Sequence, residues 1–274
     1  DVVVMDFTKA FNKVSHQRLL HKLEGFGVNN QVHDWIKNFL CERSQRVIVE
    51  WCSSSSVSVD SGVPQGTVLG PILFLLYIND LPEYVECPVR LFADDCVIYN
   101  KINSDNDASL LQQDLRNLEK WEDTWKMDFN PSKCFTMNVT RKRKPKVTDY
   151  HLKGSILENT ENSTYLGVTI RKDLKWGDHV DRISAKANKS LGLLRRNIKT
   201  DNKEVKARAF EFNTLVRPVL DYASSVWDPP LQKDIDKVQA VQRRGARFVC
   251  NRYHNTSSPS DMLQELDWEP LASR

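Results

Sequence analysis

Apolar runs bounded by turn residues dominate the first half of the chain and predict strands. Val2 to Phe7 opens with four apolar residues and fits a buried strand. Val89 to Tyr99 holds two β-prone runs on either side of an Asp-Asp pair, which predicts a hairpin with both acids at or beside its tight turn. Gln45 to Val59 predicts a second hairpin, and we place its turn at Ser53 to Ser56 because serine favours turns.

Apolar residues at helical spacing predict helices between and after these strands. Ser15 to Leu23 begins with a helix-capping serine, and Val32 to Phe39 repeats its apolar residues at helical spacing. Val68 to Ile78 is almost wholly apolar and predicts a buried helix. Ser104 to Trp125 predicts a long amphipathic helix. From Trp176 onward the pattern is helical, with little strand signal.

The order of these elements predicts an α+β protein in which an antiparallel sheet carries helices on one face. Met127 to Val139, Leu152 to Leu157 and Tyr165 to Ile170 supply shorter candidate strands. The composition then changes at the basic run Arg141 to Lys146. We therefore expect a domain boundary near residue 140, with a mainly helical region behind it.

Composition narrows the class of protein. The chain has 274 residues, of which 40% are hydrophobic and 27% charged, as is typical of a soluble globular protein. Its six cysteines show neither zinc-ligand nor disulfide spacing, which favours reduced thiols inside a cell. No signal peptide is visible and the most apolar run is too short to span a bilayer, so we expect no membrane partner.

Positive charge gathers in the second half of the chain, although the net charge is only +3. Between Arg182 and Arg208, nine Lys or Arg residues stand against two acids, a local balance of +7. Phosphate contacts from such a run give salt-sensitive nucleic-acid binding that is independent of sequence. A solvated helix face is the ordinary alternative, and the size of the charge excess favours nucleic acid. Trp121 and Trp125 are expected to fill the core rather than to stack on bases.

Three aspartates form a candidate metal site. Asp6 follows the first apolar run, and Asp94 and Asp95 lie at the predicted hairpin turn. A lone Asp-Asp pair is ordinary at a solvated turn, because aspartate makes local hydrogen bonds there. If the strands pair, three carboxylates meet at one end of a sheet. Hard oxygen ligands of this kind suit Mg²⁺, which also binds substrate phosphates.

Five motifs in this order resemble those of the reverse transcriptases of non-LTR retrotransposons, the jockey-like group in particular. Asp6 to Phe11 (DFTKAF) is similar to the family's first catalytic-aspartate motif, and Phe92 to Asp95 (FADD) to its aromatic-x-Asp-Asp box. Ser61 to Phe74 (SGVPQGTVLGPILF) resembles its substrate loop and helix. Phe129 to Cys134 and Tyr165 to Val168 resemble two later motifs, the second of which is the primer grip.

The resemblance covers essentially the whole chain. Leu215 to Pro218 and Tyr222 to Trp227 (YASSVW) are similar to the segment that follows the polymerase core. Intron maturases and telomerase-like enzymes share the palm. The motif SGVPQGTVLGP and the segment from Leu215 to Trp227 favour the retrotransposon type. The implied fold is a polymerase right-hand palm followed by a mainly helical, thumb-like region. The implied domains are an N-terminally truncated palm at 1–140 and the basic thumb-like region with a C-terminal extension at 141–274.

The resemblance implies an RNA-directed DNA polymerase that adds dNTPs to a primer 3′ end by two-metal nucleotidyl transfer. It assigns the metal ligands to Asp6, Asp94 and Asp95, with two Mg²⁺ ions, or Mn²⁺ in their place. It also implies a template RNA, a DNA primer and a dNTP as partners, and a ribonucleoprotein in the nucleus and cytoplasm. The alternative is a catalytically silent remnant that only binds nucleic acid.

Further residues receive roles from the same resemblance. The backbone carbonyl of Phe7 becomes a further metal ligand. The Phe11 ring would lie under the incoming sugar and clash with a 2′-hydroxyl, unless it is an ordinary core phenylalanine. Gln65 and Gly66 would lie beside the incoming nucleotide, unless they only form a tight turn. Lys133 would protonate the pyrophosphate leaving group as a general acid, unless it is a solvated surface lysine.

Two more groups are expected to contact nucleic acid. One group grips the primer backbone, with a short core strand as the alternative interpretation, and comprises Tyr165, Leu166 and Gly167. The other group tracks the phosphates of the template and primer from a basic helix, and comprises Arg182, Lys186, Lys189, Arg195 and Arg196.

The chain departs from the family pattern in two ways. Asn12 stands where family members usually carry Asp, at a position that is not one of the metal ligands. The fingers segment that normally precedes Asp6, and the endonuclease domain upstream of it, have no counterpart in the sequence. Asp1 also opens directly onto a predicted core strand. We therefore expect a fragment of a longer polyprotein, whose fingers and endonuclease domains are missing partners.

Overall fold

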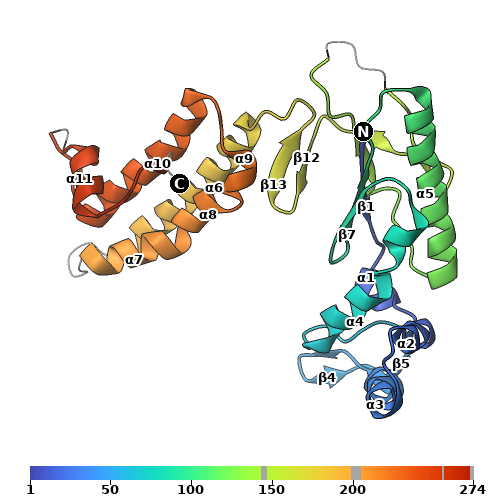
Figure 1. Ribbon diagram of the computed structural model, residues 1–274. Coiled ribbons are helices and arrows are strands. Elements are labelled where there is room, and N and C mark those ends of the chain that lie inside the picture. Colours follow the sequence, from blue (N-terminus) through green and yellow to red (C-terminus); the bar gives the residue numbers. More distant parts are fainter. Residues whose placement is uncertain (143–146, 199–204, 255, 272–274) are drawn as a thin grey trace. The chain divides into compact units, whose positions relative to one another are not determined.

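The structure is a computed structural model that describes residues 1–142, 147–198, 205–254 and 256–271. The chain forms two compact units, Asp1–Glu161 and Asn162–Arg274, each with its own hydrophobic core (Figure 1). The first unit combines a sheet with helices, so the prediction of an α+β protein is confirmed. Across the described residues, no helix is both long enough and apolar enough to cross a membrane.

A five-stranded sheet forms the centre of the first unit. Its strands, in sheet order, are β11 (Glu158–Asn159), β8 (Phe135–Met137), β1 (Val2–Asp6), β7 (Asp95–Tyr99) and β6 (Val89–Phe92). All neighbours are antiparallel except β11 and β8, which are parallel. In β1, Val3 and Met5 are fully buried. Because side chains alternate along a strand, Asp6 points to the opposite face of the sheet.

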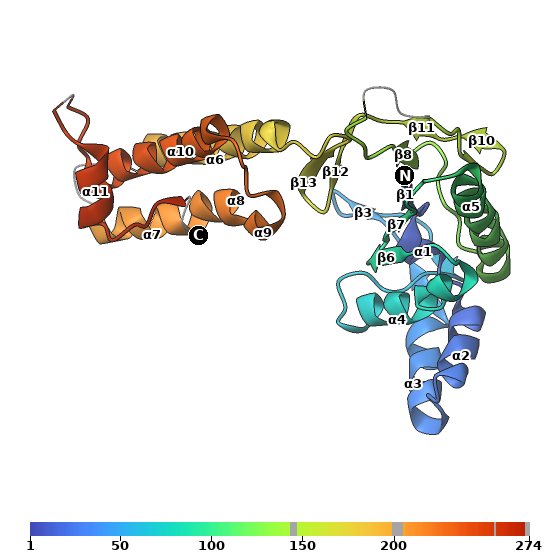
Figure 2. The same cartoon turned by 45° about the horizontal axis from the view of Figure 1, so that its top comes forward.

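The long helix α5 (Asp105–Trp125) covers the buried face of this sheet (Figures 1 and 2). It begins with a capping box, in which the carboxylate of Asp107 accepts the Ser104 backbone N–H at 2.8 Å. The apolar stripe expected from the sequence is fully buried at Leu111, Leu115 and Leu118, whereas its last member, Trp125, is half-buried. Trp121 is also fully buried. The core role expected for Trp121 is therefore confirmed. Asp6 lies on the opposite face of the sheet, which α5 does not cover.

Five further helical segments lie in the part of this unit that the structure describes. They are α1 (Ala10–Lys13), α2 (His16–Gly25), α3 (Asn30–Leu40), α4 (Leu69–Ile78) and the 3₁₀ helix η1 (Leu81–Tyr84). The helix expected at Val68 to Ile78 is present, but only one side of it is buried. Phe74 and Tyr77 are fully buried, whereas Ile72 and Leu75 are 48% and 49% exposed. The reason is that the core covers α4 from one side only.

The hairpin expected at Gln45 to Val59 is present, but its turn lies elsewhere. Its paired strands are β2 (Arg43–Gln45) with β5 (Val57–Val59), and β3 (Ile48–Val49) with β4 (Cys52–Ser53). The turn is at Glu50 and Trp51, whose φ angles are +47° and +69°. The predicted turn at Ser53 to Ser56 was wrong, because Ser54 exchanges hydrogen bonds with Val47 through its backbone N–H and its hydroxyl.

The first unit also extends beyond residue 140, where the sequence placed the domain boundary. The strands β9 (His151–Leu152) and β10 (Ser155–Ile156) form a hairpin, and the β9 strand contacts α5. Tyr150, Leu152 and Leu157 are buried in the same core as the sheet. This packing keeps the segment in the first unit up to Glu161. Residues 143–146 of the basic run that suggested the boundary lie outside the described part of the chain.

The second unit begins with a hairpin and continues with helices. The hairpin joins β12 (Asn162–Tyr165) to β13 (Val168–Arg171). The helices are α6 (Gly177–Asn197), α7 (Val205–Leu215), α8 (Arg217–Asp221), α9 (Ser224–Trp227), α10 (Gln232–Cys250) and α11 (Pro259–Glu265). Their core includes Val180, Phe212 and Trp227. The helical pattern expected from Trp176 onward is therefore confirmed for the described residues.

Candidate active site

Strand pairing brings the three aspartates to one end of the central sheet. Asp6 ends β1 and lies directly opposite Asp95, the first residue of β7. Phe92 pairs with Asp95 in turn, which leaves Ala93 and Asp94 as a two-residue turn. Directly opposed residues of an antiparallel pair point to the same face. The side chains of Asp6 and Asp95 therefore share the face of the sheet that α5 does not cover.

The electrostatics of this end of the sheet reflect the crowding of negative charge. Burial raises the pKa of the Asp95 carboxyl above its usual range, and the neighbouring carboxylates of Asp94 and Asp6 raise it further. A cation near the three groups would relieve this repulsion. One cation is present in the fold, because the Lys133 ammonium lies 3.1 Å from a carboxylate oxygen of Asp6.

The loop that carries Lys133 is bonded to the end of β1. The Asn130 N–H donates to the Asp6 carbonyl at 2.8 Å, and the Thr8 N–H donates to the Asp128 carbonyl at 2.7 Å. Next to these bonds, the rings of Phe7 and Phe129 stack with their centroids 4.4 Å apart. The loop thus forms an antiparallel extension of the sheet. This arrangement explains how Lys133 reaches a residue more than a hundred positions away in the chain.

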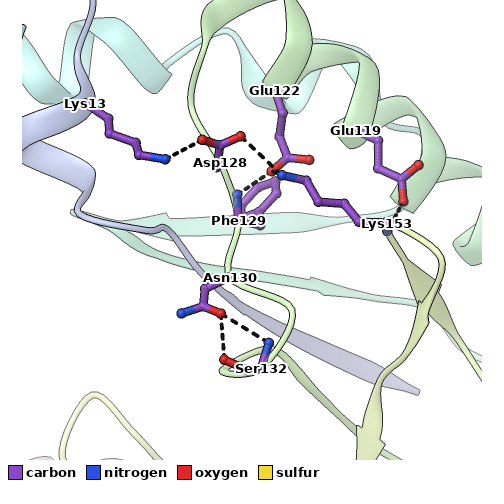
Figure 3. A network of polar contacts seen from close by, with 8 residues as sticks. All are labelled: Lys13, Glu119, Glu122, Asp128, Phe129, Asn130, Ser132 and Lys153. Carbon is purple, nitrogen blue, oxygen red and sulfur yellow. Dashed lines mark hydrogen bonds and ion pairs between the residues drawn. The ribbon is translucent and has the colours of Figure 1, made fainter.

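A polar network around the buried Glu122 supports the same loop from the side of α5 (Figure 3). Glu122, only 2% exposed, accepts the Phe129 backbone N–H. The Lys153 ammonium lies 2.9 Å from Glu122 and 3.2 Å from Asp128. Lys13 of α1 pairs with Asp128 from the other side. Burial raises the pKa of Glu122 to about 7, although Lys153 and the Phe129 N–H act in the opposite direction.

This network was not predicted from the sequence. Glu122 belongs to the buried side of α5, next to Trp121, and a glutamate on an apolar stripe was a usable signal. Lys153 follows β9 in a left-handed conformation with φ of +51°, and nothing in its sequence context pointed to Glu122.

The candidate nucleotide loop at 61–66 is fastened to the segment after Asp6. The Gly62 N–H donates to the Val14 carbonyl at 2.8 Å, and the Val63 N–H donates to the Phe11 carbonyl at 2.9 Å. A Cβ on Gly62 would lie 2.9 Å from the Asn12 backbone, so this close approach requires glycine. Backbone hydrogen bonds therefore hold the loop at 61–66 and the segment from Phe11 to Val14 together.

Three of the residues expected to contact the nucleotide lie in this loop or in the segment bonded to it. Gln65 and Gly66 are exposed, and Gly66 has a φ of +79° that favours glycine. Phe11 is half-buried, and its ring stacks on Phe74 of α4 with centroids 4.5 Å apart. The core thus holds the Phe11 ring in place. Its contact with a sugar, and the contacts of Gln65 and Gly66 with a nucleotide, stay predictions.

The donor set at the sheet end suits a divalent metal ion. Carboxylate oxygens are hard ligands. Burial raises the pKa of Asp95, and the carboxylates of Asp94 and Asp6 raise it further, so a cation beside them would be favourable. Within the described residues, no three Asp, Glu, His or Cys side chains converge into a ready-made metal cluster. Asp6 is paired with Lys133 instead, so the ammonium occupies one of the oxygens that a metal ion would use.

The residues expected to contact nucleic acid lie in the second unit. Leu166 and Gly167 form the turn between β12 and β13. Arg182, on α6, donates a hydrogen bond from its guanidinium to the Gly167 carbonyl. The Arg195 guanidinium lies 5.0 Å from the centre of the Tyr253 ring. Four cations on α6 beyond Arg182 are exposed, namely Lys186, Lys189, Arg195 and Arg196.

The far end of the basic run differs from the expectation. Arg208 is only 5% exposed, and its Nε donates to the Val249 carbonyl at 2.8 Å. Its guanidinium therefore supports the helical core, and it is not available to track phosphates. Residues 199–204 of the same run lie outside the described part of the chain.

Comparison with known proteins decides the family. The model of the family "Reverse transcriptase (RNA-dependent DNA polymerase)" matches residues 2–170. The chain belongs to this family. The match runs from the start of β1 through the three aspartates to the β12–β13 hairpin. Reverse transcriptases use divalent metal ions, which agrees with the oxygen ligands at the sheet end.

Curated relatives of this reverse transcriptase come from non-LTR retrotransposons, which confirms the resemblance. The RNA-directed DNA polymerase from mobile element jockey of Drosophila funebris is 29% identical over 262 residues, 89% of this chain and 28% of that protein. The probable RNA-directed DNA polymerase from transposon BS of Drosophila melanogaster is 27% identical over 269 residues, 92% of this chain and 29% of that protein. The chain thus spans less than a third of the length of these relatives.

A solved structure supports the fold. Telomerase from Candida tropicalis, in complex with a fragment of telomeric RNA, matches with a TM-score of 0.50 and 11% sequence identity. The match covers 98% of this reverse transcriptase chain and 40% of the telomerase chain. Together with the central antiparallel strands, it confirms the predicted polymerase right-hand fold.

Proposed function

We propose that this chain is the polymerase core of a non-LTR retrotransposon reverse transcriptase, which adds dNTPs to a primer 3′ end on an RNA template. The observation that carries the proposal is the register of Asp6 opposite Asp95, with Asp94 in the adjoining turn. The family match and the printed names of the relatives support the same activity.

In this proposal, Mg²⁺ is the divalent ion, with Mn²⁺ as a substitute. Asp6, Asp94 and Asp95 would hold it through their carboxylates, and the Phe7 carbonyl would contribute a further oxygen. When bound, the ions lower the pKa of the primer 3′-hydroxyl and neutralise charge on the triphosphate. Burial and then repulsion by Asp94 and Asp6 raise the pKa of Asp95, and the repulsion supports this assignment because a bound cation would relieve it.

The chain's own residues do the rest. Lys133 carries a proton at Nζ, and we propose that it leaves Asp6 and donates this proton to the pyrophosphate leaving group. Phe11, held by Phe74, excludes the 2′-hydroxyl of a ribonucleotide. Gln65 and Gly66 border the incoming nucleotide from a loop fastened to the Phe11 segment.

The second unit holds the template RNA and the DNA primer in this proposal. The turn at Tyr165, Leu166 and Gly167 contacts the primer backbone, and the exposed cations of α6 contact phosphates. The protein would work in the nucleus and cytoplasm as a ribonucleoprotein, together with fingers and endonuclease domains. The share of about 28–29% that the chain spans in its relatives supports the existence of such further domains in them.

Primer extension tests the proposal. The chain is incubated with poly(rA)/oligo(dT) and labelled dTTP, with Mg²⁺ or with excess EDTA. We expect dTTP incorporation that EDTA abolishes, because the reaction needs ions at the aspartates. The same duplex is also captured on a filter at rising salt concentration. Salt-sensitive retention without any incorporation would contradict the proposal and would instead support the remnant that only binds nucleic acid.

A further inference from the structure

The turn between β12 and β13 is strained. Tyr165 pairs with Val168, so Leu166 and Gly167 are its two central residues. Their φ angles are +45° and +77°, both left-handed, as in a type I′ turn. Asn and Gly fit such positions, whereas a leucine there is strained because its Cβ crowds the following carbonyl oxygen. Contacts from outside the hairpin must therefore hold this turn.

Two side chains from other elements provide these contacts. The Tyr222 hydroxyl donates to the Leu166 carbonyl at 2.9 Å, and the Arg182 guanidinium donates to the Gly167 carbonyl. The Tyr222 ring also lies against Gly167, where an added Cβ would be 3.2 Å from Cε1. Both carbonyls of the turn are thus bonded, and the tyrosine ring covers the glycine.

Tyr222 is itself fixed by its own motif. Its N–H donates to the Pro218 carbonyl at 3.0 Å, and its carbonyl accepts the Trp227 indole N–H at 2.8 Å. Trp227 is fully buried, and its ring centre lies 5.0 Å from that of His179. The YASSVW motif, which had no role assigned from its residues alone, therefore forms a hydrogen-bonded corner that presents Tyr222 to the turn.

The same contacts favour a phosphate at the turn. A free backbone carbonyl repels a phosphate oxygen, but both carbonyls here already accept hydrogen bonds from Tyr222 and Arg182. Arg182 also brings a positive charge to the turn. His179, next to Arg182, does not add a second charge, because burial and then Arg182 lower its pKa to about 4.

We propose that Tyr222 is a positioning residue, which together with Arg182 sets the Leu166–Gly167 turn so that it holds the phosphate backbone of the primer. The proposal rests on the proposed polymerase function for the identity of the ligand. The role of Tyr222 in ordering the turn stands on the contacts within the second unit alone.

The test is Tyr222→Phe in the full chain, which removes the hydroxyl and keeps the ring. Loss of one hydrogen bond predicts a rise of about fivefold in KM and Kd for poly(rA)/oligo(dT), with kcat within about twofold of wild type. Hydrogen–deuterium exchange should become faster in the peptide that contains Leu166 and Gly167. The control is Tyr84→Phe, at a partly exposed tyrosine of η1, which should leave all these quantities unchanged.

Several outcomes separate the possibilities. Unchanged KM and Kd in Tyr222→Phe, or unchanged exchange at the turn, would overturn the inference while wild-type incorporation still supported the polymerase. A fall in kcat together with a lower unfolding midpoint would show a merely structural role and would also overturn it. If the wild type incorporates no dTTP, the polymerase proposal fails, and the Kd and the exchange rates still decide the role of Tyr222.

Discussion

Replacing Asp94 with asparagine should lower kcat for dTTP incorporation on the order of 10³-fold, with the free energy of unfolding within about 1 kcal/mol of wild type. Asn is almost the same size as Asp, so the two-residue turn after Phe92 keeps its packing. The carboxylate of Asp94 is also one of the charges that raise the pKa of Asp95, so its loss relieves repulsion. Steady-state kinetics and urea unfolding measure the two quantities.

The matched control is Asp123→Asn, at an exposed position of α5, the helix that covers the opposite face of the sheet. It removes the same charge and should leave both kcat and stability near wild type. If Asp94→Asn kept more than about a tenth of the wild-type kcat, the assignment of Asp94 as a metal ligand would be wrong.

The second large effect is on stability and concerns Glu122. Burial raises its pKa to about 7 in the folded protein, from an ordinary value of 4.5 for a free side chain. The folded state therefore binds more protons between these pH values, and stability falls as the pH rises through this window. Glu122→Gln keeps the shape but cannot ionise. The free energy of unfolding of the variant, minus that of wild type, should therefore rise by roughly 3 kcal/mol as the pH increases from 4 to 8.

Urea unfolding at a series of pH values measures this difference between Glu122→Gln and wild type. Using the difference cancels the titration of other groups, such as His179, whose lowered pKa makes stability rise with pH in the acid range. Asp123→Asn on the same helix is the control, because it removes an exposed carboxylate that takes no part in the network around Glu122. Its free energy of unfolding should follow that of wild type across the pH series. A flat curve for Glu122→Gln would show that Lys153 fully offsets the burial of this carboxylate.

Local pattern was enough to predict the parts of the fold that place the aspartates. The continuous apolar run of β1 predicted its strand, the apolar stripe of α5 predicted its helix, and a capping serine marks where α5 begins. The FADD stretch combines strand-forming flanks with a two-residue turn, so its hairpin and the position of Asp95 followed directly. Pairing of Asp6 with Asp95 joins distant segments, and it was predicted only by combining both patterns.

The misses have physical causes that a linear sequence hides. Serine residues are frequent in turns, but Ser54 completes the ladder with Val47 while Glu50 and Trp51 make the turn. The basic run suggested a boundary, yet packing of Tyr150 and Leu152 under α5 keeps the following segment in the first unit.

Side-chain contacts between distant residues were the least predictable. The Lys153 to Glu122 pair and the Tyr222 to Leu166 hydrogen bond each join residues more than thirty positions apart. Neither pair lies within a strand ladder or on one helix face, so the periodicity of the sequence cannot predict these contacts. The candidate catalytic residues were accessible from motifs, whereas the residues that support them required the structure.

Metal binding at the aspartates is the most direct test of the central claim. Mn²⁺, in place of Mg²⁺, is titrated into the chain with dTTP and a template–primer whose 3′ end lacks a hydroxyl, and bound Mn²⁺ is followed by electron paramagnetic resonance. The account predicts bound Mn²⁺ in wild type and in Asp123→Asn, and loss of most of this signal in Asp94→Asn and Asp6→Asn. Equal Mn²⁺ binding in all four proteins would contradict it.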